Sequence, residues 1–282
     1  MKRIMPILLL GVSFFLSANR PAEKTSEIPL CHGISNFNEV ANSPEFIAAH
    51  PYAVNRNPNF NPLGDMIKIK TGGAEANAYL VKAKKKTNKY LFIVHEWWGL
   101  NDNIKREAEE WAEKLGVNAL AIDMYDGKVA TTPEKAGQYM RGLDENRAKE
   151  ILAGAQTYMG STAQIATIGW CFGGGWSLKS TLEFGAQAIG CVMYYGMPVK
   201  DVDVLKTLNT DVLGLFAGKE RWISPKVVAE FEANMKAAGK KLDAHSFDAD
   251  HAFANPSSAR YDKEAATKAN ALAYAYLKGK FK

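Results

Sequence analysis

From residue 66 onward, the chain alternates short apolar runs with longer segments in which apolar residues recur every three or four positions. The short runs are typical of strands buried on both faces, and the longer pattern is typical of amphipathic helices. Strands are predicted over residues 66–70, 76–84, 90–94, 117–122, 165–169, 188–194, 212–217 and 242–247. Helices are predicted over residues 103–115, 133–158 with a break near Gly142, 173–182, 225–238 and 263–277.

This alternation predicts an α/β fold in which a mostly parallel central sheet has helices on both faces. The first two strands are expected to form an antiparallel pair. A chain of 282 residues, of which 47% are hydrophobic, is large enough for one such domain with a buried core. The sequence shows no internal repeat and no second core, so we assign residues 66–282 to a single domain.

The first residues have the order of a secretory signal peptide. A positively charged start, residues 1–3, is followed by an apolar stretch, Ile4–Leu16, and then by small and polar residues. The stretch is too short for a comfortable membrane span. Cys31 lies well beyond it and follows the bulky Leu30, which argues against a lipid anchor. We predict a signal peptide over residues 1–18 and export to the periplasm or the cell exterior, without a stable membrane anchor.

Residues 19–65 are predicted to form a polar leader and an N-terminal covering extension. The extension is rich in Asn and Pro and contains one short helical pattern, Pro44–Ala49, which begins after a Ser43 cap. His32 and His50 lie in this extension. We expect both to make surface or capping hydrogen bonds rather than to take part in catalysis.

Charge and cysteine content narrow the possible partners and the redox chemistry. The net charge of +5 is spread along the chain, and its densest basic run, Lys84–Lys86, is interpreted as a solvated hairpin tip. No nucleic-acid partner is therefore expected. Three cysteines cannot all pair internally, which indicates a free thiol in an exported protein. The sequence leaves open whether Cys31 pairs with Cys191, and also the oligomeric state.

The segment Gly169–Gly175 follows a predicted strand and opens a predicted helix. It has the spacing of a nucleophile elbow, glycine-x-nucleophile-x-glycine, with Cys171 in place of serine. The helix N-terminus favours a thiolate there. A Gly-rich turn with a buried structural cysteine is the alternative. A phosphate loop is excluded, because the Gly-Lys-Ser/Thr ending is missing.

A nucleophilic thiol needs a base, and the base needs an orienting acid. His251 lies after a late strand and before the last helix, where the nucleophile, acid, histidine order of α/β-hydrolases requires it. Glu220 occupies the turn after the penultimate strand, from which an acid can orient the imidazole. Asp248 and Asp250 are rival candidates, because both are close to His251 in sequence.

The turn after the first long buried strand carries the residues His95-Glu96-Trp97-Trp98. A carboxylate at the end of a buried strand, beside two tryptophans, is costly unless it is used, so Glu96 is a candidate site residue. His95 and Glu96 do not indicate a zinc protease, because no second histidine follows at helical spacing and the context is a strand.

These motifs, taken together from about Met66 to the C-terminus, resemble the dienelactone hydrolase family, also called carboxymethylenebutenolidases, of the α/β-hydrolase superfamily. The resemblance rests on Glu96, Asp123-Met124-Tyr125, the elbow around Cys171, the turn at Glu220 and His251-Ala252-Phe253. It implies that Cys171 is the nucleophile, His251 the base and Glu220 the triad acid, and that Glu96 helps to activate the thiol when substrate binds. The backbone N–H groups of Phe172 and Trp97 are implied as the oxyanion hole.

Two positions depart from the family pattern. The family acid is usually Asp, and Glu220 is longer by one methylene group, although Glu is an accepted acid in such triads. Members that cleave dienelactone carry an arginine four residues after the histidine, where this chain has Asn255. The change removes the natural partner of a substrate carboxylate, which argues against dienelactone itself as the substrate.

The expected activity is that of a carboxylic-ester hydrolase, which cleaves a small-molecule ester or lactone through a thioester and needs no cofactor or metal ion. Trp97, Trp98, Tyr125 and Trp170 are expected to shape an apolar pocket with Asn255. A thioesterase or peptidase on the same scaffold and a non-catalytic ligand-binding protein are the alternatives. A redox-sensing thiol protein is a third, but the chain lacks a Cys-x-x-Cys pair.

Overall fold

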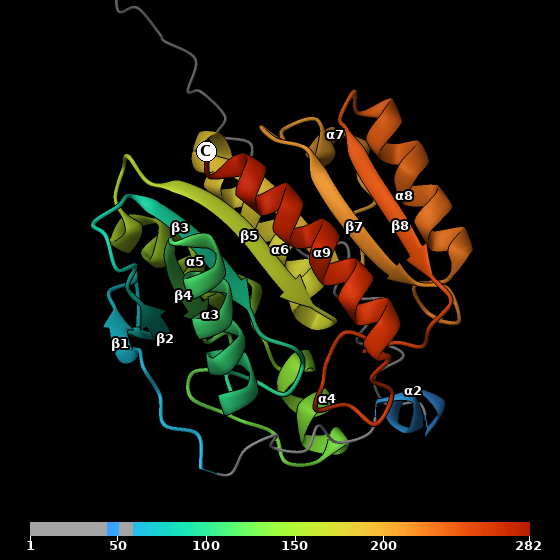
Figure 1. The fold of residues 1–282 in the computed structure, drawn as a ribbon, viewed down its shortest axis with the longest axis horizontal. Helices are drawn as coiled ribbons and strands as arrows, with labels where there is room; N and C mark the ends of the chain where they lie inside the picture. Colours follow the sequence, from blue (N-terminus) through green and yellow to red (C-terminus); the bar gives the residue numbers. More distant parts are fainter. Residues whose placement is uncertain (1–43, 51–58) are drawn as a thin grey trace, which may run out of the picture.

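An eight-stranded sheet forms the centre of the computed structural model, which describes residues 44–50 and 59–282 (Figure 1). Its strands are β1 (Asp65–Ile69), β2 (Ala76–Val81), β3 (Lys89–Val94), β4 (Asn118–Ile122), β5 (Gln164–Trp170), β6 (Ala188–Tyr194), β7 (Val212–Ala217) and β8 (Leu242–Phe247). They lie in the order β1-β2-β4-β3-β5-β6-β7-β8, and within this sheet β2 runs against the direction of the others. The predicted antiparallel pair and the mostly parallel sheet are therefore confirmed.

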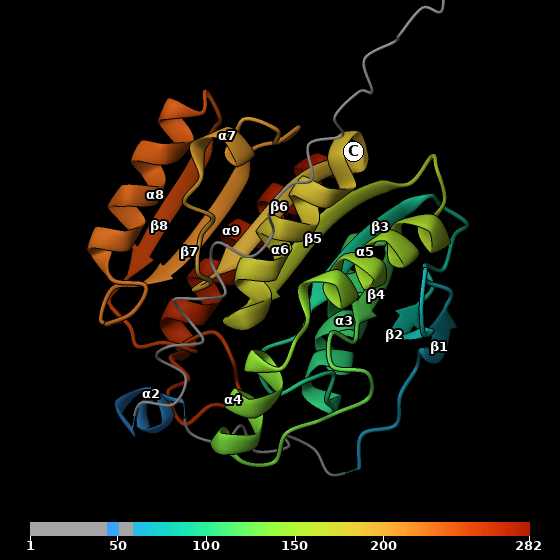
Figure 2. The same cartoon turned by 180° about the vertical axis from the view of Figure 1, so that it is seen from behind.

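Helices cover both faces of the sheet, as the alternating pattern predicts. In the described residues they are α2 (Pro44–Ala49), α3 (Asp102–Leu115), α4 (Pro133–Arg141), α5 (Glu145–Met159), α6 (Phe172–Phe184), α7 (Val202–Leu205), α8 (Pro225–Ala237) and α9 (Lys263–Lys280), with a 3-10 turn at Gly185–Gln187. Helices α3 and α9 lie on one face, and α5 and α6 lie on the other (Figures 1 and 2). The central strands are buried on both faces, which explains their uninterrupted apolar runs.

Short polar residues and glycines set the limits of the helices. The side chain of Asn101 accepts a hydrogen bond from a first-turn N–H of α3, and Gly116 ends that helix in the left-handed region at a φ of 69°. Thr132 caps α4, and α5 starts after an Asp144 cap. The break expected near Gly142 separates these two helices.

Two details differ from the sequence prediction. Lys84–Lys86 are not a hairpin tip, because β4 lies between β2 and β3 and the connection that carries the run passes the start of β4. The run is solvated as expected, and Lys84 Nζ pairs with Glu113 Oε1 at 3.4 Å. Helix α7 was not predicted, because its four residues are too few to show a helical period.

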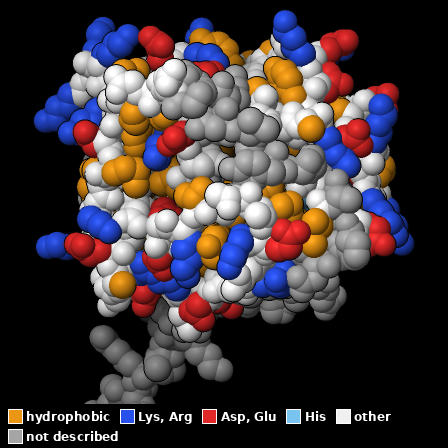
Figure 3. Space-filling view, turned by 90° about the horizontal axis from the view of Figure 1, so that it is seen from below, with side chains coloured by type: hydrophobic (Ala, Val, Ile, Leu, Met, Phe, Trp, Pro, Cys, Tyr) orange, Lys and Arg blue, Asp and Glu red, His pale blue; other side chains and the backbone are white. Residues whose placement is uncertain are grey.

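The strand order reverses at β3, which has β4 on one side and β5 on the other. In open parallel sheets, a ligand crevice forms at such a point, beyond the carboxyl ends of the strands. The turns after β3 and β5 carry Glu96 and Cys171, so the fold brings these two candidates to the same edge. Figure 3 shows this edge face-on: charged side chains stand mostly around its rim, and hydrophobic patches lie among them.

The predicted signal peptide (residues 1–18) lies outside the described residues, as do most of the predicted extension (19–65) and Cys31. Residues 44–50 and 59–65 of the extension are described, and helix α2 in the first of these segments lies beside the edge that carries the carboxyl ends of the strands (Figure 1). No helix in residues 44–50 or 59–282 combines the length and the apolar composition needed to cross a bilayer.

Candidate active site

Cys171 lies in a strained, very tight turn between β5 and α6. Its φ of 57° and ψ of −120° are unusual for a residue other than glycine. A Cβ atom at Gly169 would lie 2.0 Å from the carbonyl oxygen of Gly173, and a Cβ at Gly173 would lie 2.2 Å from that of Val94. The turn therefore requires glycine on both sides of the cysteine. The N–H of Cys171 donates to the carbonyl oxygen of Tyr194 at 3.0 Å, which anchors the turn to β6.

His251 and Glu220 form a buried pair beside this turn. Glu220 follows β7 and His251 follows β8, so adjacent parallel strands deliver both residues to the same edge. Nδ1 of His251 lies 2.8 Å from Oε2 of Glu220, and each side chain is 1% exposed. Such a contact fixes the ring orientation and leaves Nε2 as the nitrogen on the opposite side of the ring.

The two rival acids lie elsewhere. The side chain of Asp248 is 91% exposed, and its Oδ2 lies 3.3 Å from Nζ of Lys219. Asp250 is half-exposed, and its Oδ1 lies 3.8 Å from NH1 of Arg260. The structure therefore places Glu220, and neither aspartate, against His251.

The charged neighbours of His251 decide its protonation. Burial alone lowers the pKa of His251, but the charges of Glu220 and Cys171 and the hydrogen bonds to them raise it well above 6.5. A protonated imidazole next to a thiol is the arrangement that sustains a thiolate–imidazolium pair.

Glu96 is a buried carboxyl group on the other side of the site. Burial raises its pKa from 4.5 to about 7, although the charge of His251 and a hydrogen bond from Asn255 act in the opposite direction. In that hydrogen bond, Nδ2 of Asn255 donates to Oε2 of Glu96 at 2.5 Å. Asn255 thus holds Glu96 in place.

His95, next to Glu96, has a structural part in the site. Its Nδ1 lies 2.6 Å from the carbonyl oxygen of Glu96, and its Nε2 accepts a hydrogen bond from the N–H of Met124 at 3.1 Å. Burial lowers the pKa of His95, which agrees with a neutral ring that donates on one side and accepts on the other. Both nitrogens are engaged, so His95 ties the turn after β3 to the turn after β4.

Two adjoining pockets share the Glu96–Asn255 pair as a wall. The first is narrow and is lined by His50, Glu96, Trp97, Trp98, Cys171, His251, Ala252, Asn255 and Ser258. The second is also narrow and is lined by Glu96, Asn103, Ile104, Glu107, Trp170, Ala254 and Asn255.

The aromatic residues expected around the pocket are divided among three places. Trp97 and Trp98 line the first pocket, and Trp170 lines the second. Tyr125 lines neither and packs behind the site, with its ring 4.7 Å from that of His95 and 5.4 Å from that of Phe172. Phe172 is the first residue of α6, where helical N–H groups have no partner within the helix.

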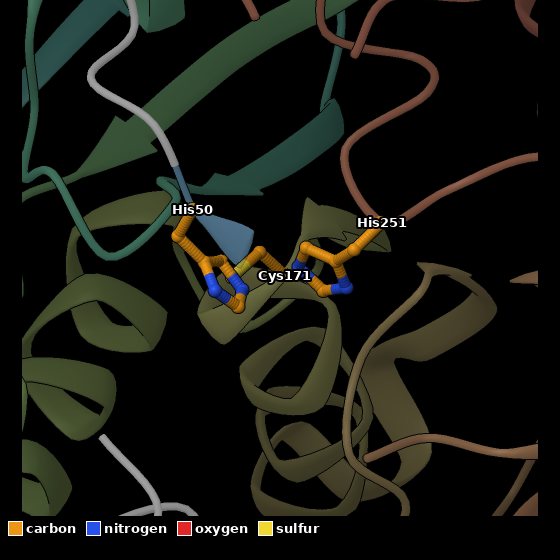
Figure 4. Close-up of side chains that lie close together, drawn as sticks. All are labelled: His50, Cys171 and His251. Atoms are coloured by element: carbon orange, nitrogen blue, oxygen red, sulfur yellow. The ribbon is translucent and has the colours of Figure 1, made fainter. Parts of the chain in front are cut away.

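His50 is a site residue that the sequence interpretation missed. The expected capping contact exists. His50 is the residue directly after α2, and its Nδ1 lies 2.7 Å from the carbonyl oxygen of Phe46 in that helix. The ring is not on the surface, however, because it is 5% exposed and lies 4.5 Å from the ring of His251. Figure 4 shows the two imidazoles on either side of Cys171. The hydrophobic Phe46, which packs on Trp97 and Trp222, was the available signal that α2 docks on the domain.

The profile of the dienelactone hydrolase family matches residues 76–281. The chain belongs to this family. A relative, carboxymethylenebutenolidase 1 from Cupriavidus pinatubonensis, is 25% identical to this chain over 224 residues, which cover 74% of this chain and 94% of the relative. A putative carboxymethylenebutenolidase from Saccharolobus solfataricus is 27% identical over 241 residues and covers 70% of this chain and 91% of its own.

The fold also matches solved members of the family. The crystal structure of a putative dienelactone hydrolase from Klebsiella pneumoniae superposes with a TM-score of 0.65 at 22% identity, covering 76% of this chain and 97% of that one. The protein is therefore a hydrolase with the α/β-hydrolase fold. His50 precedes the residues that match the family profile, so this dienelactone hydrolase family member adds a side chain to its pocket from outside the matched region.

The geometry of the elbow predicts that the stability of the protein depends strongly on the glycines of this turn. Replacing Gly169 by Ala forces a Cβ against backbone atoms that cannot move aside, so we expect a loss of about 3 kcal/mol or more in unfolding free energy. Gly279→Ala is the matched control, because nothing lies within 4 Å of that position in α9, and it should change stability by less than about 1 kcal/mol. Urea unfolding of both variants checks this, and equal effects would contradict the elbow geometry.

The raised pKa of Glu96 predicts a pH-dependent stability. Between pH 4.5 and about 7, the folded protein holds a proton that the unfolded chain releases, so the contribution of Glu96 to stability falls as pH rises. Glu96→Gln removes this ionisation. Relative to wild type, its unfolding free energy should rise by up to about 3 kcal/mol between pH 5 and pH 8. The exposed Glu232→Gln is the control in urea titrations, and a pH-independent difference for Glu96→Gln would refute the assignment.

Proposed function

We propose that the protein is an exported hydrolase that cleaves uncharged esters or lactones through a Cys171–His251–Glu220 triad and a thioester acyl-enzyme. The observation that carries the proposal is the buried contact of 2.8 Å between His251 and Glu220, beside a cysteine in a nucleophile elbow. Export is inferred from the charged, apolar and small-residue order of residues 1–18.

Acylation begins with the thiolate–imidazolium pair. Sγ of Cys171 bonds to the carbonyl carbon, and the oxyanion accepts hydrogen bonds from the N–H groups of Phe172 and Trp97. The carbon–oxygen bond to the leaving group then breaks, and the alkoxide takes the proton from Nε2 of His251. Glu220 holds the imidazole in position through Nδ1 and stabilises its charged form.

Deacylation uses the same groups in reverse. Nε2 of His251 takes a proton from water, the water oxygen bonds to the thioester carbon, and the carbon–sulfur bond breaks to return the thiolate. Glu96 lines the same pocket as Cys171 and His251, and its pKa of about 7 lets it hold or release a proton near neutral pH. It is therefore suited to adjust the protonation of the thiol when substrate displaces the hydrogen bond from Asn255.

The charges around the pockets favour uncharged substrates. Among the described residues, the linings of both pockets contain no Lys or Arg, whereas Glu96 and Glu107 contribute carboxyl groups. Asn255 can donate a hydrogen bond but carries no charge to balance a carboxylate. A substrate whose acid group must lie beside the scissile bond is thus disfavoured.

Intact mass spectrometry tests the roles of Cys171 and His251. After brief exposure to an activated aryl ester, wild type should hydrolyse the ester, His251→Ala should retain an added acyl mass, and Cys171→Ala should do neither. Spectra of protein recovered after expression with its native N-terminus also report whether the predicted signal peptide is removed.

Steady-state kinetics test the role of Glu220. Glu220→Gln should lower kcat by at least about a hundredfold, whereas Asp248→Asn, the matched control at an exposed position, should retain wild-type kcat.

Absence of both an adduct and turnover across aryl esters and lactones would rule out acyl transfer and leave ligand binding as the function. An unchanged kcat in Glu220→Gln with a loss in Asp248→Asn would move the triad acid to the turn before His251.

Paired lactones test the substrate class. For two lactones that differ in one carboxylate, we expect kcat/KM of wild type to be at least about tenfold higher for the uncharged compound, since a buried carboxylate without a cationic partner is strongly disfavoured. Asn255→Arg should narrow or invert that ratio, and Asn255→Gln serves as the uncharged control. A wild-type preference for the carboxylated lactone would overturn the proposed class.

A further inference from the structure

His50, Cys171 and His251 form a compact set of metal-ligating side chains that the hydrolytic reaction uses only in part. One ligand atom from each of the three residues lies within 4.8 Å of the other two, and all three residues are buried. The cysteine stands between the two imidazoles in Figure 4. Thiolate and imidazole are the ligand types that zinc prefers.

Both histidines are oriented as metal ligands are. Nδ1 of His50 is engaged by the carbonyl oxygen of Phe46 at 2.7 Å, and Nδ1 of His251 faces the carboxylate of Glu220 at 2.8 Å. A metal-binding histidine commonly has its second nitrogen held by a carbonyl or a carboxylate in this way. The arrangement leaves Nε2 of each ring for another partner, and the buried Nε2 of His50 has none among the described residues.

We propose that His50, Cys171 and His251 bind one Zn²⁺-like cation, and that the metal-bound protein is inactive in acyl transfer. Three protein ligands leave a fourth position open toward the pocket, where water completes a tetrahedral site. Ligand atoms of a tetrahedral zinc ion lie about 3.5 Å apart, so the distances between the ligand atoms, which are at most 4.8 Å, shorten by about 1.3 Å at most. His50 follows the short peripheral helix α2, which makes it the ligand that moves most readily.

The charge around the set suits a divalent cation. Glu220 lies behind His251, Glu96 lines the same pocket, and the lining contains no Lys or Arg among the described residues. The positive charge of Arg260 also acts on His50. It is partly balanced by Asp250, because NH1 of Arg260 lies 3.8 Å from Oδ1 of that carboxylate. When the cation binds, the thiolate–imidazolium pair loses the proton on Nε2 of His251 to solvent, and sulfur and nitrogen each give a lone pair to the metal.

Inhibition follows from that bonding. The sulfur lone pair that attacks a carbonyl is held by the cation, and Nε2 of His251 can no longer carry a proton to the leaving group. His95 cannot replace His50, because its two nitrogens are occupied by the carbonyl oxygen of Glu96 and the N–H of Met124. The site therefore depends on a ligand from the N-terminal extension.

Cobalt(II) is the probe that tests the site without substrate. Metal-free full-length protein, kept reduced, should bind one equivalent of Co²⁺ with a near-ultraviolet thiolate-to-cobalt band, and one equivalent of Zn²⁺ should displace it. His50→Ala should weaken binding at least about a hundredfold, since even residues that only orient a ligand contribute ten- to a hundredfold. His50→Cys supplies another ligand and should retain binding, which separates ligation from folding.

His245→Gln is the matched control, because this half-exposed histidine on β8 lies beside Asp243, outside the pocket, and should leave cobalt affinity and zinc inhibition unchanged. In wild type, one equivalent of Zn²⁺ should abolish ester hydrolysis, and a chelator should restore it. Lack of the thiolate band, or equal affinity in His50→Ala and wild type, overturns the metal site. Full hydrolysis with the metal bound overturns its inhibitory effect.

The proposed metal binding does not depend on the hydrolytic activity, whereas the proposed inhibition rests on it. A protein that binds cobalt through Cys171 but hydrolyses no ester keeps the metal site and loses the triad mechanism. A protein that hydrolyses esters and binds no cobalt gives the reverse result.

Discussion

The close backbone approach between β5, α6 and β3 is the constraint on which the site depends. Gly169 and Gly173 allow helix α6 to start almost in contact with the end of β3, and the strained Cys171 is the residue that remains at the apex. The approach also fixes the distance between the turns that carry Cys171 and Glu96. The topological switch at β3 supplies the crevice, and the glycines decide how closely its two walls meet.

Burial of several ionisable groups in one crevice is tolerated because their charges oppose each other. Glu220 and the thiol stabilise a protonated His251, whereas Glu96, which has a polar but uncharged partner in Asn255, keeps a raised pKa. Both carboxyl groups are almost fully buried, but their nearest neighbours differ: Nδ1 of His251 for Glu220 and the side-chain amide of Asn255 for Glu96.

The fold and most of the site could be predicted because their signals are local. The apolar run of β4 indicates a strand buried on both faces, and the glycines around Cys171 indicate a tight turn. Each signal is contained within a few consecutive residues. The carboxylate that contacts His251 could not be chosen from sequence proximity, because adjacent strands bring Glu220 to His251 while the side chain of Asp248 is exposed to solvent. His50 was missed for a related reason. Phe46 indicates that α2 docks on the domain, but the sequence of this segment does not indicate which surface it contacts.

The docking of α2 means that the functional unit and the family domain have different boundaries. The elbow, the Glu220–His251 pair and strands β2 to β8 lie within residues 76–281, whereas β1 and His50, which lines the pocket, lie outside them. A fragment trimmed to the matched residues would keep Cys171, Glu220 and His251 and lose His50 from the pocket wall. An exchange of the segment around α2 would therefore alter the pocket wall without altering the elbow or the Glu220–His251 pair.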